Sequence, residues 1–71
     1  MIRIMLSKLL GERKMTQKDL AIKAGIRPNT INALYHGYAK MVSLQNLDKI
    51  CKALDCSLDE LMEYKSDNPD H

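Results

Sequence analysis

Two asparagines, Asn29 and Asn32, have the chemistry and spacing in this sequence to recognise a base pair. A side-chain amide offers one hydrogen-bond donor and one acceptor, which together complement the major-groove edge of adenine. Residues three positions apart on a helix project from the same side, so both amides could enter one groove. Each amide could instead be exposed to solvent or contact a phosphate. The pair forms a base-reading surface only if a helix presents both side chains outward.

Cationic and small side chains lie close to the two asparagines in the sequence. Arg27 can reach a phosphate or a guanine, and the methyl group of Ala33 suits the methyl group of thymine. This composition favours half-sites that contain A·T pairs. His36 suits a phosphate contact or the carbonyl end of a helix, and no second ligand is spaced to join it in a metal site. The further candidates for phosphate contacts are Gln17, Lys18, Thr30, Tyr38 and Lys40.

The segment that must position these side chains reads as two short helices joined by a tight turn. Thr16 can cap the first helix, with Asp19 three residues later as in a capping box. Gly25 suits the left-handed position that ends a helix. Pro28 suits the first position of a second helix, and Gly37 would close that helix. We therefore expect a helix-turn-helix over residues 16–37.

Helices joined by so short a turn must cross at close range, which requires a small residue at the crossing. Ala21 fills that place, and Ile31 would pack over it from the second helix. With the glycine of the turn, these positions resemble the helix-turn-helix of the Cro/C1-type (Xre-like) repressors of phages and bacteria. Counting from Gln17, the apolar, small and glycine positions of that family are filled in order by Leu20, Ala21, Ala24, Gly25, Ile26, Ile31 and Leu34.

The resemblance implies an all-α fold, a compact five-helix DNA-binding domain with the helix-turn-helix at helices two and three. In the family, a glutamine at the position of Gln17 clamps a phosphate or a base at the edge of the site. The segment that contains Tyr38 and Lys40 runs along the DNA backbone, although the Tyr38 ring could equally pack over the neighbouring loop. Arg27 and Pro28 depart from the family, in which Ser or Thr often caps the recognition helix, so the specificities of relatives do not transfer.

Three more helices are expected around the motif. Ser7 would cap the first, which runs to about Lys14 and turns its leucines inward. Ser43 would cap the fourth, which runs to about Leu54. The apolar stripe of this fourth helix, expected in the core, consists of Leu44, Leu47, Ile50, Cys51 and Leu54.

A fifth helix would begin with the capping box of Ser57 and Glu60 and end near Tyr64. The domain would thus cover residues 1–64, with residues 65–71 as a disordered polar tail. The first six residues, MIRIML, alternate weakly between apolar and other side chains. They could be a flexible lead-in to the first helix or a short strand that pairs with the same segment of a second copy.

Charge is divided along the 71 residues. Residues 1–43 carry eight basic and two acidic side chains, a net charge of +6, whereas residues 44–71 carry three basic and seven acidic ones, a net charge of −4. The basic part contains the predicted helix-turn-helix, as expected if that part faces a polyanion. The acidic part should face away from it.

The sequence contains no apolar run long enough for a signal peptide or a membrane span, so we expect a cytoplasmic protein. Cys51 and Cys56 lack the spacing of a zinc site and are expected to be small buried residues in a reducing compartment. No cofactor, metal or small-molecule ligand is predicted. A catalytic function is also not expected, because there is no nucleophile with a base and no phosphate-binding glycine loop.

The function that the resemblance implies is sequence-specific binding of double-stranded DNA by a transcriptional regulator, in particular a repressor. Its recognition helix would enter the major groove, and a homodimer would bind an operator with two half-sites. The alternative is a protein-interaction or antitoxin-like module that uses the same helical fold. A neutral or acidic recognition helix would favour that alternative, whereas this one carries Arg27 and no carboxylate.

Overall fold

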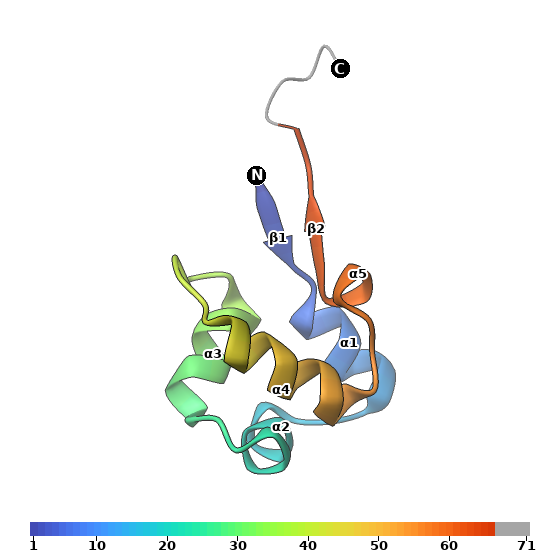
Figure 1. Cartoon of the computed structure of the whole chain (residues 1–71). Helices are drawn as coiled ribbons and strands as arrows, with labels where there is room; N and C mark the ends of the chain where they lie inside the picture. The colour runs from blue at the N-terminus through green and yellow to red at the C-terminus, as the bar shows by residue number, and fades with distance from the viewer. Residues whose placement is uncertain (67–71) are drawn as a thin grey trace.

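The computed structural model describes residues 1–66. These residues form five helices and one antiparallel pair of strands, with the helices gathered in one cluster and the strands running side by side away from it (Figure 1). The predicted five-helix fold is confirmed. In chain order the elements are β1 (Ile2–Ile4), α1 (Leu6–Arg13), α2 (Gln17–Ala24), α3 (Pro28–His36), α4 (Leu44–Leu54), α5 (Leu58–Leu61) and β2 (Met62–Tyr64).

Side-chain caps fix the start of three helices as predicted. At α2, the backbone N–H of Asp19 donates to Oγ1 of Thr16 (3.0 Å), and the N–H of Thr16 donates to the Asp19 carboxylate (3.1 Å). Ser57 and Glu60 form the same reciprocal pair at α5. Ser43 accepts from the N–H of the third residue of α4. Each cap satisfies backbone groups that a helix end leaves without intrahelical partners.

The predicted start of the first helix is wrong by two residues. α1 begins at Leu6 with Met5 at the N-cap position, and Ser7 lies exposed inside the helix and caps nothing. The N–H of Met5 instead donates to the carbonyl of Leu61 (2.7 Å), and its carbonyl accepts from Leu9 (3.1 Å). A contact with the far end of the chain therefore sets the start of α1.

The core consists of aliphatic side chains from all five helices, and α2 packs against both α3 and α4. Leu44, predicted to be in this core, is 83% exposed, because the first turn of α4 extends past the edge of the core. Cys51 and Cys56 are only half-buried, and both are free thiols. The buried residues are Leu6, Leu9, Leu10, Leu20, Ala21, Ile26, Ile31, Leu34, Leu47, Ile50, Ala53, Leu54 and Leu61.

The fifth helix is a single turn, so the prediction that it continues to Tyr64 is wrong. Met62 already has extended backbone angles (φ −132°, ψ 147°), and β2 begins there. β2 pairs antiparallel with β1 in a register that sets Ile4 opposite Met62 and Ile2 opposite Tyr64. Hydrogen bonds to a distant strand replace the helical bonds that this segment would otherwise make.

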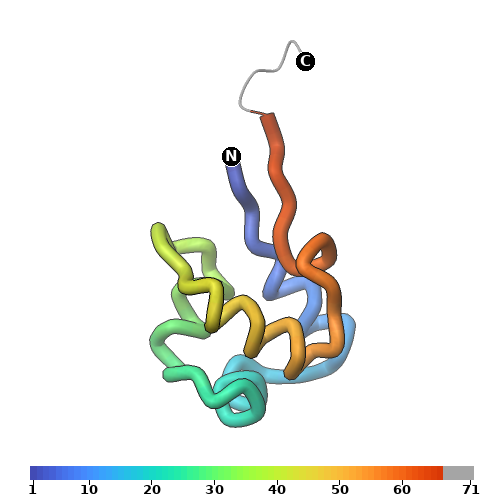
Figure 2. The backbone as a smooth tube through the Cα atoms, in the orientation of Figure 1, coloured from blue at the N-terminus to red at the C-terminus, as the bar shows by residue number. Residues whose placement is uncertain are grey.

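The strand expected as one alternative at the N-terminus is present, but it pairs with residues 62–64 of the same chain. The pairing continues past β2, since the N–H of Lys65 donates to the carbonyl of Met1 (2.8 Å) and the amino group of Met1 donates to the carbonyl of Lys65. Figure 2 shows these two ends of the described chain running together. Most of the predicted tail, residues 67–71, lies outside the described residues. Within residues 1–66, no helix has the length and apolarity to cross a bilayer.

Candidate nucleic-acid interface

The turn between α2 and α3 has the predicted left-handed geometry. Gly25 adopts φ 69° and ψ 38°, and the N–H groups of Gly25 and Ile26 both donate to the carbonyl of Ala21 at 3.0 Å. Ile26 then returns to the core. A non-glycine residue in this conformation would be strained, so Gly25 allows the chain to reverse immediately after α2.

Two buried side chains anchor α3 to the rest of the domain. Ile31 is fully buried and Leu34 nearly so, and Ala21 on the facing helix α2 is also buried. Pro28 occupies the first position of α3. Arg27 precedes it in an extended conformation and makes no side-chain cap, while its carbonyl accepts from Thr30 (3.0 Å) and Ile31 (3.2 Å). The Arg27 guanidinium is thus exposed and not used in capping.

The surface of α3 that faces away from the core presents the predicted polar groups. Asn29, Asn32 and His36 are exposed, while Thr30 and Ala33 are partly buried. The amide pair is therefore accessible from solvent on a helix whose other side is fixed in the core. The methyl group of Ala33 is less available for a base contact than the sequence suggests.

Three aromatic rings gather at the end of α3. The rings of His36 and Tyr38 stack with centroids 5.5 Å apart and an interplanar angle of 21°, and Tyr35 meets the His36 ring edge-on at 5.0 Å. Gly37 is left-handed (φ 76°), and the N–H of Tyr38 returns to the carbonyl of Ala33 (2.8 Å). The Tyr38 ring thus stacks on His36, and it stays exposed. The sequence analysis missed this cluster, although two aromatic residues flanking a helix-ending glycine are a usable signal.

The remaining phosphate candidates lie at the ends of helices or in the loop after α3. Gln17 is the first residue of α2 and is partly buried, whereas Lys18 beside it is exposed. At such a helix end the backbone N–H groups favour an anion. Lys40 is exposed in the loop between α3 and α4.

Residues 16–40 carry a positive charge, with four basic side chains against the single acid Asp19. The backbone N–H and the hydroxyl of Thr16 hold the pKa of Asp19 below its ordinary value, so this carboxylate is occupied with the cap of α2. In the part of the chain that the structure describes, the salt bridges lie outside this segment. The basic groups of the segment are Lys18, Lys23, Arg27 and Lys40.

Arg13, the last residue of α1, is partly buried. Its Nε–H donates to the carbonyl of Leu54 at 2.8 Å. This bond joins the end of α1 to the end of α4, and Arg13 contributes less to the exposed basic surface than the sequence suggests.

A helix, a left-handed turn, and a second helix with an anchored aliphatic side and an exposed amide side together define a helix-turn-helix protein. The model of the Cro/C1-type HTH DNA-binding domain matches residues 5–67 of this chain. The chain is also 38% identical over 66 residues to the uncharacterized HTH-type transcriptional regulator YozG of Bacillus subtilis (strain 168), an alignment that covers 93% of this chain and 79% of the relative. The chain belongs to the Cro/C1-type HTH DNA-binding family, which is a family of DNA-binding domains and not a class of enzymes.

Proposed function

We propose that the protein regulates transcription by binding a specific operator with α3 in the major groove, and that it represses by occupying promoter DNA. The observation that carries this proposal is the exposure of Asn29 and Asn32 on a helix that Ile31 and Leu34 anchor from the opposite side. Because the anchor fixes the helix, the amides are held ready without a rearrangement of the backbone. Such a regulator acts in the cytoplasm, a compartment that also suits two free thiols.

The side chains divide into two roles in this proposal. The exposed amides of α3 and the guanidinium of Arg27, which precedes this helix, read base edges, with Ala33 beside them as a small apolar contact. The second group holds the DNA backbone and sets the register of α3 on the duplex. In this group the exposed Tyr38 hydroxyl can donate to a phosphate while its ring rests on His36. The base-reading residues are Arg27, Asn29, Asn32 and Ala33, and the phosphate-binding residues are Gln17, Lys18, Thr30, His36, Tyr38 and Lys40.

A homodimer on a two-half-site operator is part of the same proposal. One recognition helix of this length reaches only a few base pairs, too few to select a site among many competing sequences. Two copies related by a twofold axis would read two inverted half-sites about one helical turn apart.

Selection of bound sequences from a random pool of double-stranded DNA tests this function. The expected result is a pair of inverted half-sites containing A·T pairs, with centres about 10 base pairs apart. Binding should also weaken steeply as salt rises, since phosphate contacts release counterions. The doubly substituted Asn29→Ala, Asn32→Ala chain serves as the control and should keep salt-dependent binding but lose the enriched sequence. A pool that stays random for the unsubstituted chain would reject sequence-specific recognition.

A further inference from the structure

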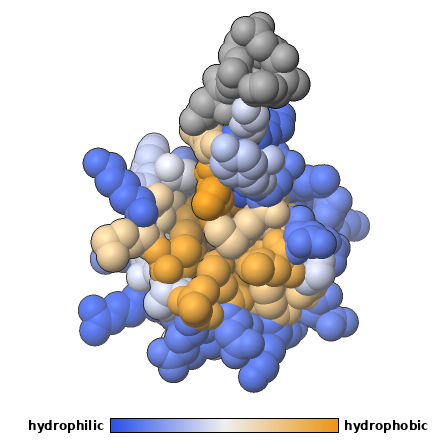
Figure 3. Space-filling view, turned by 45° about the horizontal axis from the view of Figure 1, so that its top comes forward, coloured by the Kyte–Doolittle hydropathy of each residue, from blue (hydrophilic) through white to orange (hydrophobic). Residues whose placement is uncertain are grey.

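One side of the molecule exposes large apolar side chains that no element of the described chain covers. Figure 3 shows a hydrophobic area in the middle of one face, with hydrophilic residues around it. Met41 is 90% exposed and Leu44 is 83% exposed, although both are fully apolar. Monomeric soluble proteins rarely expose a contiguous apolar patch of more than a few hundred Å² unless the patch binds a partner. The other residues of this apolar face are Ile2, Leu58 and Tyr64, all exposed. Ile2 lines both the groove beside Met41 and a neighbouring hollow with Leu58 and Tyr64, so these residues adjoin one another.

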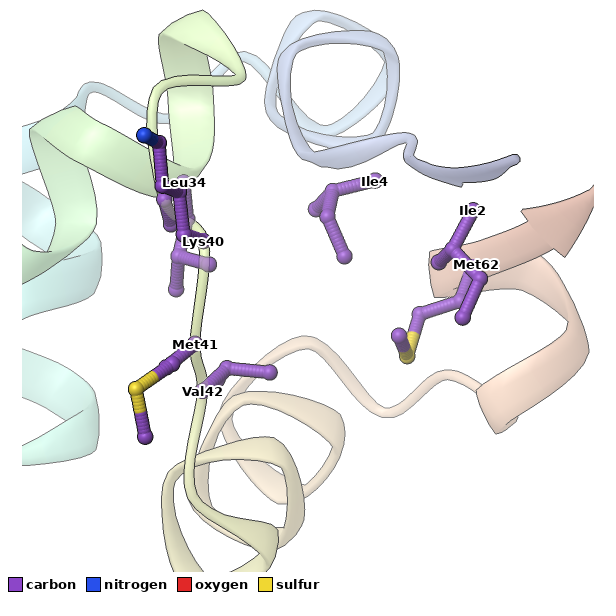
Figure 4. Close-up of a pocket in the computed structure, with 8 residues that line it drawn as sticks. Ile2, Ile4, Leu34, Lys40, Met41, Val42 and Met62 are labelled. Atoms are coloured by element: carbon purple, nitrogen blue, oxygen red, sulfur yellow. The ribbon is translucent and has the colours of Figure 1, made fainter.

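A groove runs beside Met41 between the strands and the loop after α3. Its volume is about 230 Å³. In Figure 4, Val42 and Leu34 lie on one side of it and Ile4 and Met62 on the other, while the Met41 side chain points away from it. An apolar cavity of about 150 Å³ is large enough to bind one molecule of benzene. The groove therefore has room for one or two apolar side chains.

The strand register explains why the groove is apolar on the strand side. Alternate residues of a strand point to opposite faces. The pairing of Ile2 with Tyr64 and of Ile4 with Met62 sets these four residues on one face of the sheet. Arg3 pairs with Glu63 on the other face, where their side chains form a salt bridge (3.8 Å). Two short strands alone are only marginally stable in water, so their apolar face favours a covering partner.

We infer that a second copy of this chain covers the apolar face, with Met41 and Leu44 of each copy entering the groove of the other. The same surface holds both a groove and protruding side chains suited to fill it. Such a surface is self-complementary under a twofold axis, because each contact then occurs twice. This inference rests on the proposed function, which requires two copies on one operator.

The size of the face agrees with a dimer. Burying one aliphatic side chain removes roughly 100 Å² of apolar area from water. The five residues of the apolar face, with the groove lining, then bury roughly 600 Å² per copy and about 1,200 Å² in total, the lower end for a specific interface. A weak contact of smaller area would bury fewer of these residues.

Few charges border the apolar face: Lys40 lines the groove at one end, and Asp59 lines a neighbouring hollow with Leu58. A face that is mainly apolar suits the same apolar face of a second copy better than it suits a partner of one charge sign. The exposed amides of α3 take no part in lining the groove, so DNA and the second copy do not compete for them.

Sedimentation equilibrium of the full chain without DNA tests the inference. The unsubstituted chain should sediment at twice its monomer mass of 8.1 kDa. Leu44→Glu and Met41→Glu should each raise the dimer dissociation constant about a hundredfold, because the buried charge occurs twice in the interface. Both side chains are exposed in the single chain, and an acid at the first residue of α4 suits the helix dipole. The variants should therefore fold.

Ile22→Glu is the matched control, since Ile22 is another exposed apolar residue, on α2 and outside the apolar face. It should leave the dimer unchanged. A monomeric unsubstituted chain, a Leu44→Glu chain that remains dimeric, or an Ile22→Glu chain that dissociates would each overturn the inference. Binding of the same protein samples to DNA distinguishes the two proposals. A dimer that does not bind DNA refutes the proposed function but not this interface.

Discussion

The Nε–H of Arg13 donates a hydrogen bond to the backbone carbonyl of Leu54 across 2.8 Å, and this bond joins the last residue of α1 to the last residue of α4. The carbonyl groups at the end of a helix have no intrahelical partners and carry partial negative charge. A partly buried guanidinium is therefore well matched to this position. One side chain thus links the first helix to the long helix behind the recognition motif.

We expect Arg13→Ala to lower the free energy of unfolding by about 1–2 kcal/mol, through loss of a charge-assisted hydrogen bond and its helix-end interaction. Urea unfolding followed by circular dichroism measures the change. Lys8→Ala, which removes an exposed cation from the same helix, should change the free energy by less than about 0.5 kcal/mol. Equal effects at both positions would show that the Arg13 contact contributes nothing of its own.

Alanine substitutions at two glycines should change the free energy of unfolding in opposite directions. Gly11 lies within α1, where an added Cβ meets no atom within 4 Å, so Gly11→Ala should raise the free energy of unfolding by about 0.5–1 kcal/mol. Gly25 has equal space but a left-handed backbone (φ 69°), so Gly25→Ala should lower it by about 1 kcal/mol or more. Thermal unfolding of the two variants measures both changes. If Gly25→Ala is as stable as the unsubstituted chain, the turn does not need its left-handed residue.

Base-reading and phosphate-binding residues should respond differently to substitution. Asn32→Ala should reduce discrimination between the selected operator and random DNA by about 1–3 kcal/mol. Lys40→Ala should weaken binding to both DNAs equally and lower the salt slope by about 1. Fluorescence anisotropy with both DNAs over a range of salt concentrations measures the two quantities. A Lys40→Ala effect confined to the operator would contradict its assignment as a phosphate contact.

The capping boxes should make stability sensitive to acid. The backbone N–H and hydroxyl of Thr16 hold the pKa of Asp19 below its ordinary value, and those of Ser57 do the same for the pKa of Glu60. Because the folded pKa is the lower one, the unfolded state binds more protons and stability rises with pH. The contribution is complete above the unfolded carboxyl pKa, about 4, and is lost as the pH falls through the folded pKa.

Unfolding measured at several pH values from about 6 to 2 should therefore show less stability at the acid end. Asp19→Asn and Glu60→Gln should each flatten this dependence. Glu12→Gln, which neutralises an exposed acid on α1, should leave it unchanged. If both capping variants lose stability at low pH as the unsubstituted chain does, the two carboxylates contribute nothing to stability.

The sequence predicted the parts of the fold that short-range chemistry decides. Thr16, Gly25 and Pro28 act within a few residues, so their cap, turn and helix start could be predicted from spacing alone. The errors at Ser7 and Tyr64 have one common cause. β1 and β2 lie at opposite ends of the described chain. No local pattern in residues 62–64 indicates that they pair with a strand at the N-terminus.

In the candidate site, too, some features could be predicted from the sequence and others could not. The exposure of Asn29 and Asn32 follows from helical periodicity once Ile31 and Leu34 are assigned to the core. The stack of His36 on Tyr38 does not, because the direction of the chain after the recognition helix depends on the left-handed turn that ends it. A prediction from periodicity stops where the helix stops.

The joining of the two ends of the described chain has a kinetic consequence. The contacts between neighbouring helices close short loops, whereas the pairing of β1 with β2 closes a loop that spans almost the whole described chain. The amide protons of β1 should therefore be the first to exchange with deuterium and the last to regain protection on refolding. A newly synthesised chain would therefore form its helices before β1 pairs with β2.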